Sequence, residues 1–116
     1  MGLNVAEKIL TDINYEKSTI AEVKRLILKH DNWAFGDSFV DEPVLLAFNN
    51  YDFMWMASEK GFDVCRAAMK MEPKEFYHKI EKFQQENINR GSRWFNKGTE
   101  DLYVKMMVER KKENCI

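Results

Sequence analysis

Apolar residues at helical spacing, with few residues that interrupt helices, constrain the fold more than any other feature of this chain. The 116 residues include only five Gly and two Pro. Apolar side chains recur every three or four positions through most of the sequence, for example at Ile20, Val23 and Ile27. This spacing is typical of amphipathic helices. We therefore predict an all-α fold, a compact bundle of five or six helices in a single domain, 1–116.

The segment 43–60 is predicted to be the most buried helix. Pro43 fits its first turn, and Gly61 suits its C-terminal cap. Its apolar side chains form two adjacent faces: Val44, Phe48, Tyr51 and Trp55 on one, and Leu46, Phe53 and Ala57 on the other. A helix this apolar lies either at the centre of a core or against a partner. We expect one core that contains Leu46, Phe48, Phe53, Trp55, Phe76 and Ile80.

Residues 61–83 have the pattern of a short helix, a tight turn and a longer helix. The first helix carries the small residues Cys65, Ala67 and Ala68, which allow another helix to cross closely. The second helix, which begins at Pro73, places Phe76, Ile80 and Phe83 on one face. This arrangement is that of a helix-turn-helix.

The same stretch resembles the helix-turn-helix of small phage and bacterial DNA-binding regulators. The resemblance is carried by Val64-Cys65, Ala68 and the run Met71-Glu72-Pro73-Lys74-Glu75-Phe76-Tyr77-His78-Lys79-Ile80. The turn glycine of those regulators is absent, with Met69 in its place and Lys70 as an extra residue. The resemblance implies a helix-turn-helix-like segment over 61–90 and a regulator that contacts double-stranded DNA with the helix at 73–84.

Basic and aromatic residues on and after this helix are the candidate nucleic-acid-binding residues. On its outer face lie Lys74, His78, Lys79 and Lys82, with Tyr77 at the edge. Arg90, Arg93 and Lys97 follow, beside the aromatic pair at 94–95, and suit contacts to phosphates and a stacked base. Alternatively, the two aromatic residues seal the base of the last helix.

The final segment is predicted to be a helix that starts near Thr99 and ends at Arg110 to Lys112. A short hairpin near 94–104 is the alternative, across the turn at Lys97-Gly98. The last helix also offers a face for a homodimer, formed by Leu102, Tyr103, Met106, Met107 and Val108. The alternative is that this helix packs back on residues 43–60 of its own chain.

Charge is unevenly distributed and suggests a second function. Residues 1–60 carry 6 basic and 10 acidic side chains, whereas residues 61–97 carry 8 and 5. An acidic half with an aromatic loop, 33–39, fits a protein-binding inhibitor of the phage anti-defence type. Such an inhibitor blocks a host nucleic-acid-binding protein through its acidic and aromatic surface. A DNA binder instead presents the basic segment as one patch.

Other classes lack their sequence signals. No phosphate-binding glycine loop, nucleophile elbow or zinc-protease motif occurs, so we expect no enzyme, no cofactor and no metal site. No apolar run approaches the roughly 20 residues of a membrane span. Two cysteines and no visible signal peptide favour a reduced, cytoplasmic setting.

Overall fold

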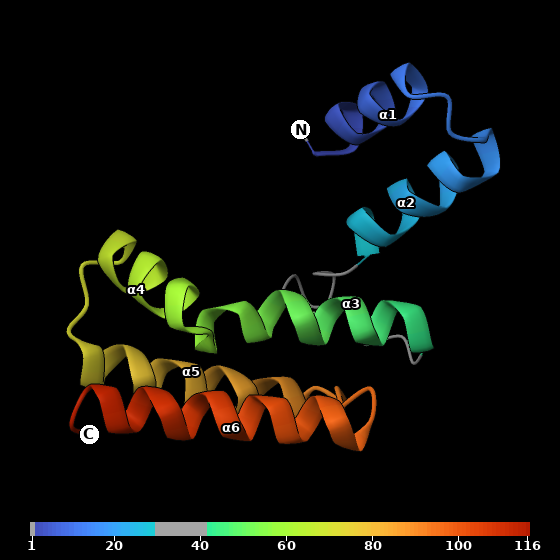
Figure 1. Cartoon of the computed structure of the whole chain (residues 1–116). Coiled ribbons are helices and arrows are strands. Elements are labelled where there is room, and N and C mark those ends of the chain that lie inside the picture. The colour runs from blue at the N-terminus through green and yellow to red at the C-terminus, as the bar shows by residue number, and fades with distance from the viewer. Residues whose placement is uncertain (1, 30–41) are drawn as a thin grey trace.

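The computed structural model describes residues 2–29 and 42–116, and these residues form a bundle of α-helices without a strand (Figure 1). The helices are α1 (Gly2–Asp12), α2 (Lys17–Lys29), α3 (Pro43–Met54), α4 (Glu59–Ala68), α5 (Pro73–Asn89) and α6 (Lys97–Glu113), with a 3-10 turn at Trp55–Ala57. The all-α prediction is confirmed. The alternative hairpin near 94–104 is wrong, because most of that segment is the start of α6.

The helices are arranged as a bundle with a helical hairpin at one end. In Figure 1, α5 and α6 run antiparallel side by side, and α3 and α4 lie over them. The α1–α2 hairpin stands at the far end of α3, which α2 contacts. The molecule measures 49 × 28 × 27 Å, and this hairpin accounts for much of its length. The aromatic loop 33–39 lies outside the described residues.

The core lies where α3, α4, α5 and α6 meet. It consists of Phe53, Met54, Ala57, Phe62, Phe76, Tyr77, Ile80 and Met107. The rings of Phe62 and Phe76 meet edge to face at 5.1 Å and join α4 to α5. Of the predicted core, Phe53, Phe76 and Ile80 are confirmed, and Leu46 is buried as well.

Phe48 and Trp55 are exceptions to that prediction, because both are exposed. The neighbouring helices cover only one side of α3, the side that holds Leu45, Leu46 and Phe53. Phe48 and Trp55 lie on the opposite side. The expectation that the whole apolar arc of 43–60 is core is therefore wrong.

Gly61 does not cap the preceding helix, contrary to the sequence prediction. The helix stops at Met54, and α4 begins at Glu59 with Ser58 as its N-cap. The Ser58 hydroxyl accepts a hydrogen bond from the Gly61 amide at 3.1 Å and donates one to the Trp55 carbonyl at 2.7 Å. A Cβ on Gly61 would lie 1.9 Å from the Trp55 carbonyl oxygen. Glycine is needed here for close approach of the backbone, rather than for a helix end.

The turn between α4 and α5 places Lys70 in the conformation that glycine favours. Its φ is 55°, and the amides of Lys70 and Met71 donate to the carbonyls of Ala67 and Arg66 at 3.1 and 3.0 Å. This pair of bonds is the Schellman motif that ends many helices. Lys70 thus takes the position that a turn glycine fills in other helix ends.

The crossing of α4 and α5 also differs from the prediction. Ala67 and Ala68 are exposed, and Cys65 is only half-buried. The contact is made one to two turns earlier, at Phe62. Of the three small residues, Cys65 packs against the core, whereas Ala67 and Ala68 do not. Partial burial raises the pKa of the Cys65 thiol.

The last helix, α6, packs on its own chain, which splits the predicted dimer face. Met107 is buried in the core, and Tyr103 and Met106 pack against it. Leu102 and Val108 remain exposed. Because Met107 is buried, the five side chains do not share one exposed surface, and homodimer formation through this helix stays a prediction.

Arg110 is buried within α6 rather than exposed at its end. Its guanidinium donates to the Ala57 carbonyl at 3.4 Å and to the Glu113 carboxylate at 2.9 Å. Arg110 thereby ties the last turn of α6 to the 3-10 turn after α3.

None of the described helices is long and apolar enough to cross a bilayer.

Candidate functional site

The candidate nucleic-acid-binding residues are spread along α5 and the loop that follows it. Lys74, His78 and Lys82 are exposed on one row of α5, since they are spaced four residues apart. Arg90, Arg93 and Lys97 are exposed beyond the other end of the helix, and Lys79 is half-buried. Lys74 and Arg90 are separated along the helix axis by roughly 24 Å, at 1.5 Å per residue. The structure therefore brings only part of the set together.

Tyr77 does not lie at the edge of this row. It is buried beside Phe76 and Ile80, because its position on the helix faces the core. Burial raises the pKa of its hydroxyl, and the negative charge of Glu81 raises it further. Its predicted place on the exposed face is wrong.

The exposed face of α5 is mixed in charge rather than basic. Glu75, Glu81 and Glu86 are exposed on the same helix as the lysines. His78 Nδ1 lies 2.8 Å from the Glu81 carboxylate. The three acidic residues balance Lys74, Lys79 and Lys82, so this helix presents no net positive charge to a phosphate backbone.

The loop between α5 and α6 is held to α3 by the side chain of Asn50. Its amide nitrogen donates to the Arg93 carbonyl at 3.2 Å, and its amide oxygen accepts from the Phe95 amide at 2.8 Å. Asn50 is buried, so both backbone groups are satisfied away from solvent. Nothing in the sequence pattern marked this residue as a clamp.

The aromatic pair in this loop is divided between core and surface. The Trp94 ring packs on Tyr103 at 5.0 Å between ring centroids and is half-buried against the core. Phe95 is exposed. Lys97 pairs with Asp101 at 3.2 Å and with Glu100 at 3.7 Å. The side chain of Asp101 and then the charges of both acids raise the pKa of Lys97. The position of Trp94 fits the alternative prediction for this pair, in which the aromatic side chains seal the base of the last helix.

An apolar stripe on α3 is the most distinctive exposed surface in the described part of the chain. It consists of Val44, Phe48, Tyr51 and Trp55, which are 61%, 38%, 51% and 50% exposed. The residues follow the spacing i, i+4, i+7, i+11, so they form one row along α3 that ends at Trp55, the first residue of the 3-10 turn. The Tyr51 hydroxyl lies 3.4 Å from the Thr99 hydroxyl at the start of α6. We call this row the α3 stripe.

The α3 stripe lies in an acidic part of the chain. No Lys or Arg occurs between residues 30 and 59, whereas six Asp and Glu residues do. Of these, Glu42, Asp52 and Glu59 belong to the described residues. Glu42 pairs with Arg25 of α2 at 2.8 Å, and Arg25 also pairs with Glu22 at 2.7 Å. These hydrogen bonds raise the pKa of Arg25, and its bond to Glu22 lowers the pKa of that carboxyl.

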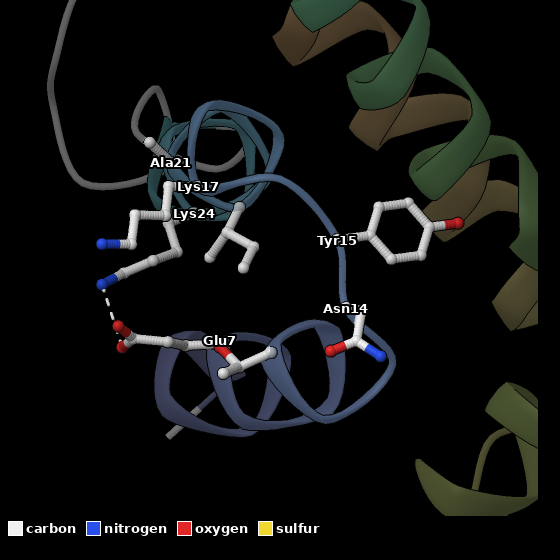
Figure 2. Close-up of a pocket in the computed structure, with 8 residues that line it drawn as sticks. Glu7, Asn14, Tyr15, Lys17, Ala21 and Lys24 are labelled. Carbon is white, nitrogen blue, oxygen red and sulfur yellow. Dashed lines mark hydrogen bonds and ion pairs between the residues drawn. The ribbon is translucent and has the colours of Figure 1, made fainter.

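A pocket of about 570 Å³ lies between α1 and α2 (Figure 2). It is lined by Glu7, Thr11, Asn14, Tyr15, Lys17, Ile20, Ala21 and Lys24. Glu7 and Lys24 point toward one another across it and form an ion pair at 3.1 Å. The pocket is thus the open space between two short helices, bridged by that ion pair.

Comparisons and metal chemistry add no further site. No family model matches this sequence, and no curated protein or solved structure matches it either. Within residues 2–29 and 42–116, no three His, Cys, Asp or Glu side chains gather as metal ligands would.

Proposed function

We propose that this protein is a protein-interaction module that presents α3 as a recognition helix to a groove on a partner protein. The observation that carries the proposal is the exposed α3 stripe. Helices that bind in hydrophobic grooves place their anchors at i, i+3 or i+4, and i+7 on one face. Aromatic anchors such as Tyr51 and Trp55 contribute most to the affinity of such interfaces.

The buried side of α3 supports this role, because its contacts hold the helix in place before a partner binds. Leu45, Leu46 and Phe53 are buried beneath it. Asn50 holds the α5–α6 loop against the same side of the helix. A recognition helix that is already ordered loses little conformational entropy on binding.

Charge complementarity defines the partner as a protein whose groove has an apolar floor and a basic rim. The absence of Lys and Arg from residues 30–59, with six acidic residues there, favours Lys and Arg on the opposite surface. Basic grooves of this kind are typical of nucleic-acid-binding proteins. The α3 stripe, in this acidic segment of the sequence, therefore fits an inhibitor that occupies the nucleic-acid-binding groove of another protein.

The test compares stripe variants with a matched control. Tyr51→Ser and Trp55→Ser should each weaken binding to a partner recovered from host-cell extract by more than tenfold. Val108→Ser, an exposed apolar residue on α6, should leave binding unchanged. Duplex or single-stranded nucleic acid should compete with the protein for that partner. Equal binding by both stripe variants and the control would contradict the proposal.

A second candidate function is binding of duplex DNA by α5, in line with its resemblance to a recognition helix. The supporting observation is the exposed row of Lys74, His78 and Lys82. If Lys74, Lys79 and Lys82 contact phosphates, log affinity falls with log salt by roughly 0.9 per contact. Alanine at all three should flatten that slope by about 2 to 3 units. A mobility-shift titration that detects no duplex binding at low salt would exclude this candidate.

A further inference from the structure

The pocket between α1 and α2 is a candidate binding site that is separate from the α3 stripe (Figure 2). All of its lining residues belong to α1, to α2 or to the turn between them. From α2 come Lys17, Ile20, Ala21 and Lys24, which are spaced i, i+3, i+4, i+7 and therefore share one face of the helix. The volume of about 570 Å³ lies within the roughly 300 to 1,000 Å³ of small-molecule sites.

The pocket leaves the seam of the hairpin incompletely filled. Thr11 of α1 and Ala21 of α2 line it, and both side chains are small, whereas packed helices normally fill the space between them. No described side chain of α1 is buried, and Ile20 is the one buried residue of α2. A ligand with an apolar body would therefore cover apolar surface of Ile20 and Ala21 that the hairpin itself leaves open.

The charged residues of the pocket carry one more positive than negative charge. Figure 2 shows Lys17, Lys24 and Glu7 on one side of the pocket, and Asn14 and Tyr15 on the other. Lys24 pairs with Glu7 at 3.1 Å. Lys17 forms no ion pair with any residue in the described part of the chain. One ammonium group of the lining is thus left to pair with a negative charge on a ligand.

We propose that this pocket binds a small organic carboxylate, a molecule with an apolar body and a single negative charge. Its carboxylate accepts a charge-assisted hydrogen bond from the Lys17 ammonium, and its apolar body lies on Ile20 and Ala21. A single uncompensated ammonium suits a monoanion rather than a polyanion such as nucleic acid. Because every lining residue belongs to the hairpin, the site does not depend on the partner proposed for α3.

A bound carboxylate should stabilise the hairpin. The two helices contain 11 and 13 residues, and helices this short are marginal in water unless their apolar faces are packed. A ligand that binds only the folded hairpin makes its local opening rarer. Hydrogen exchange at the amides of α1 and α2 should therefore slow when the ligand is added, whereas exchange in α5 should not change.

Three probes give the first arm of the test. Octanoate should shift the amide resonances of Ile20 and Ala21 in a saturable NMR titration. Acetate lacks the apolar body and 1-octanol lacks the charge, so each should bind at least roughly tenfold more weakly. The absence of a saturable shift with octanoate would overturn the proposal, as would equal binding of octanoate and 1-octanol.

Charge variants give the second arm. Lys17→Gln should weaken octanoate binding by roughly tenfold, because it removes the hydrogen bond to a charged group. Lys60→Gln, at an exposed lysine of α4, is the matched control and should bind as the wild type does. Glu7→Gln should tighten binding, because it frees the Lys24 ammonium from its carboxylate partner. Unchanged binding in Lys17→Gln, or weaker binding in Glu7→Gln, would contradict the proposal.

A filled pocket gives the third arm. Ala21→Leu places a larger side chain in the pocket and should abolish octanoate binding, with an unchanged helical circular dichroism spectrum. Ala67→Leu makes the same change at an exposed position of α4 and should leave binding as in the wild type. Octanoate that still binds Ala21→Leu with wild-type affinity must lie elsewhere, which would overturn the proposal.

Discussion

At the scale of single residues, position 61 is where a side chain larger than that of glycine should be tolerated least. Gly61→Ala would place a methyl group 1.9 Å from the Trp55 carbonyl oxygen, so the 3-10 turn and α4 must move apart. We expect a loss of roughly 3 kcal/mol in unfolding free energy, the upper range for overpacked sites. Urea denaturation measures it. Gly98→Ala is the control, because its nearest neighbour stands at 3.4 Å. A loss of less than about 1 kcal/mol for Gly61→Ala would refute this packing.

Lys70 offers the opposite case, a residue whose replacement by glycine should help. Its φ of 55° lies in the left-handed region, where a side chain costs about 1 kcal/mol or more. Part of the gain is offset by the larger entropy of glycine in the unfolded chain. Lys70→Gly should therefore raise the unfolding free energy by roughly 0.5 to 1 kcal/mol, whereas Lys70→Ala should not. Equal melting temperatures for both variants would contradict the assigned turn.

At the scale of elements, Asn50 links α3 to the α5–α6 loop through two hydrogen bonds. Asn50→Ala leaves the Arg93 carbonyl and the Phe95 amide without these partners. We expect a loss of about 2 to 3 kcal/mol in unfolding free energy. Hydrogen exchange should be faster at the Phe95 amide in particular. Exchange at the Phe95 amide that is as slow in Asn50→Ala as in the wild type would argue against the clamp.

Phe76 and Phe48 provide a matched pair that separates core from surface. Both are predicted from the sequence to lie in the core, but only Phe76 is buried, against Phe62 of α4. Phe76→Ala should cost about 3 to 5 kcal/mol, because it leaves a cavity between α4 and α5. Phe48→Ala should cost much less, since its ring is already partly in water. Chemical denaturation of both variants checks this, and similar losses would contradict the arrangement of the helices.

Some element boundaries follow from local residues and could be predicted, namely the starts of α3 and α5 and the approximate extent of α6. Pro73 starts α5, and the acidic and basic ends of α6 fit its dipole. The end of α3 after Met54 could not be predicted from local residues, because it depends on a 3-10 turn that lets Gly61 approach Trp55. A glycine in the sequence indicates either a backbone conformation that other residues disfavour or a close approach of another backbone segment. Only the structure shows which of the two applies.

The candidate site was harder to predict, for a geometrical reason. Helical spacing identifies the α3 stripe as a row of apolar residues, but it does not tell which rows the neighbouring helices cover. The same limit applies to Tyr77, whose position relative to the core depends on where α6 lies. Asn50 gave no signal at all, because its partners are backbone groups more than 40 residues away in sequence.

At the scale of the whole molecule, charge differs between two parts of the chain. The α3 stripe belongs to residues 1–60, where acidic side chains outnumber basic ones, whereas α5 belongs to residues 61–97, where basic side chains are in excess. The proposed recognition surface is therefore suited to a basic partner.

The stability of the whole bundle should fall at alkaline pH because of Tyr103. Burial raises the pKa of Tyr103 above its ordinary value near 10, and the charge of Glu81 raises it further. A raised pKa in the folded state means that stability is fully present below the unfolded value. It is then lost as the pH rises past about 10, because only the unfolded chain ionises readily there. Tyr103→Phe keeps the ring contacts with Phe53 and Trp94 and should flatten this decline in urea unfolding between about pH 9 and 11. If the decline in Tyr103→Phe is as steep as in the wild type, another group is responsible for it.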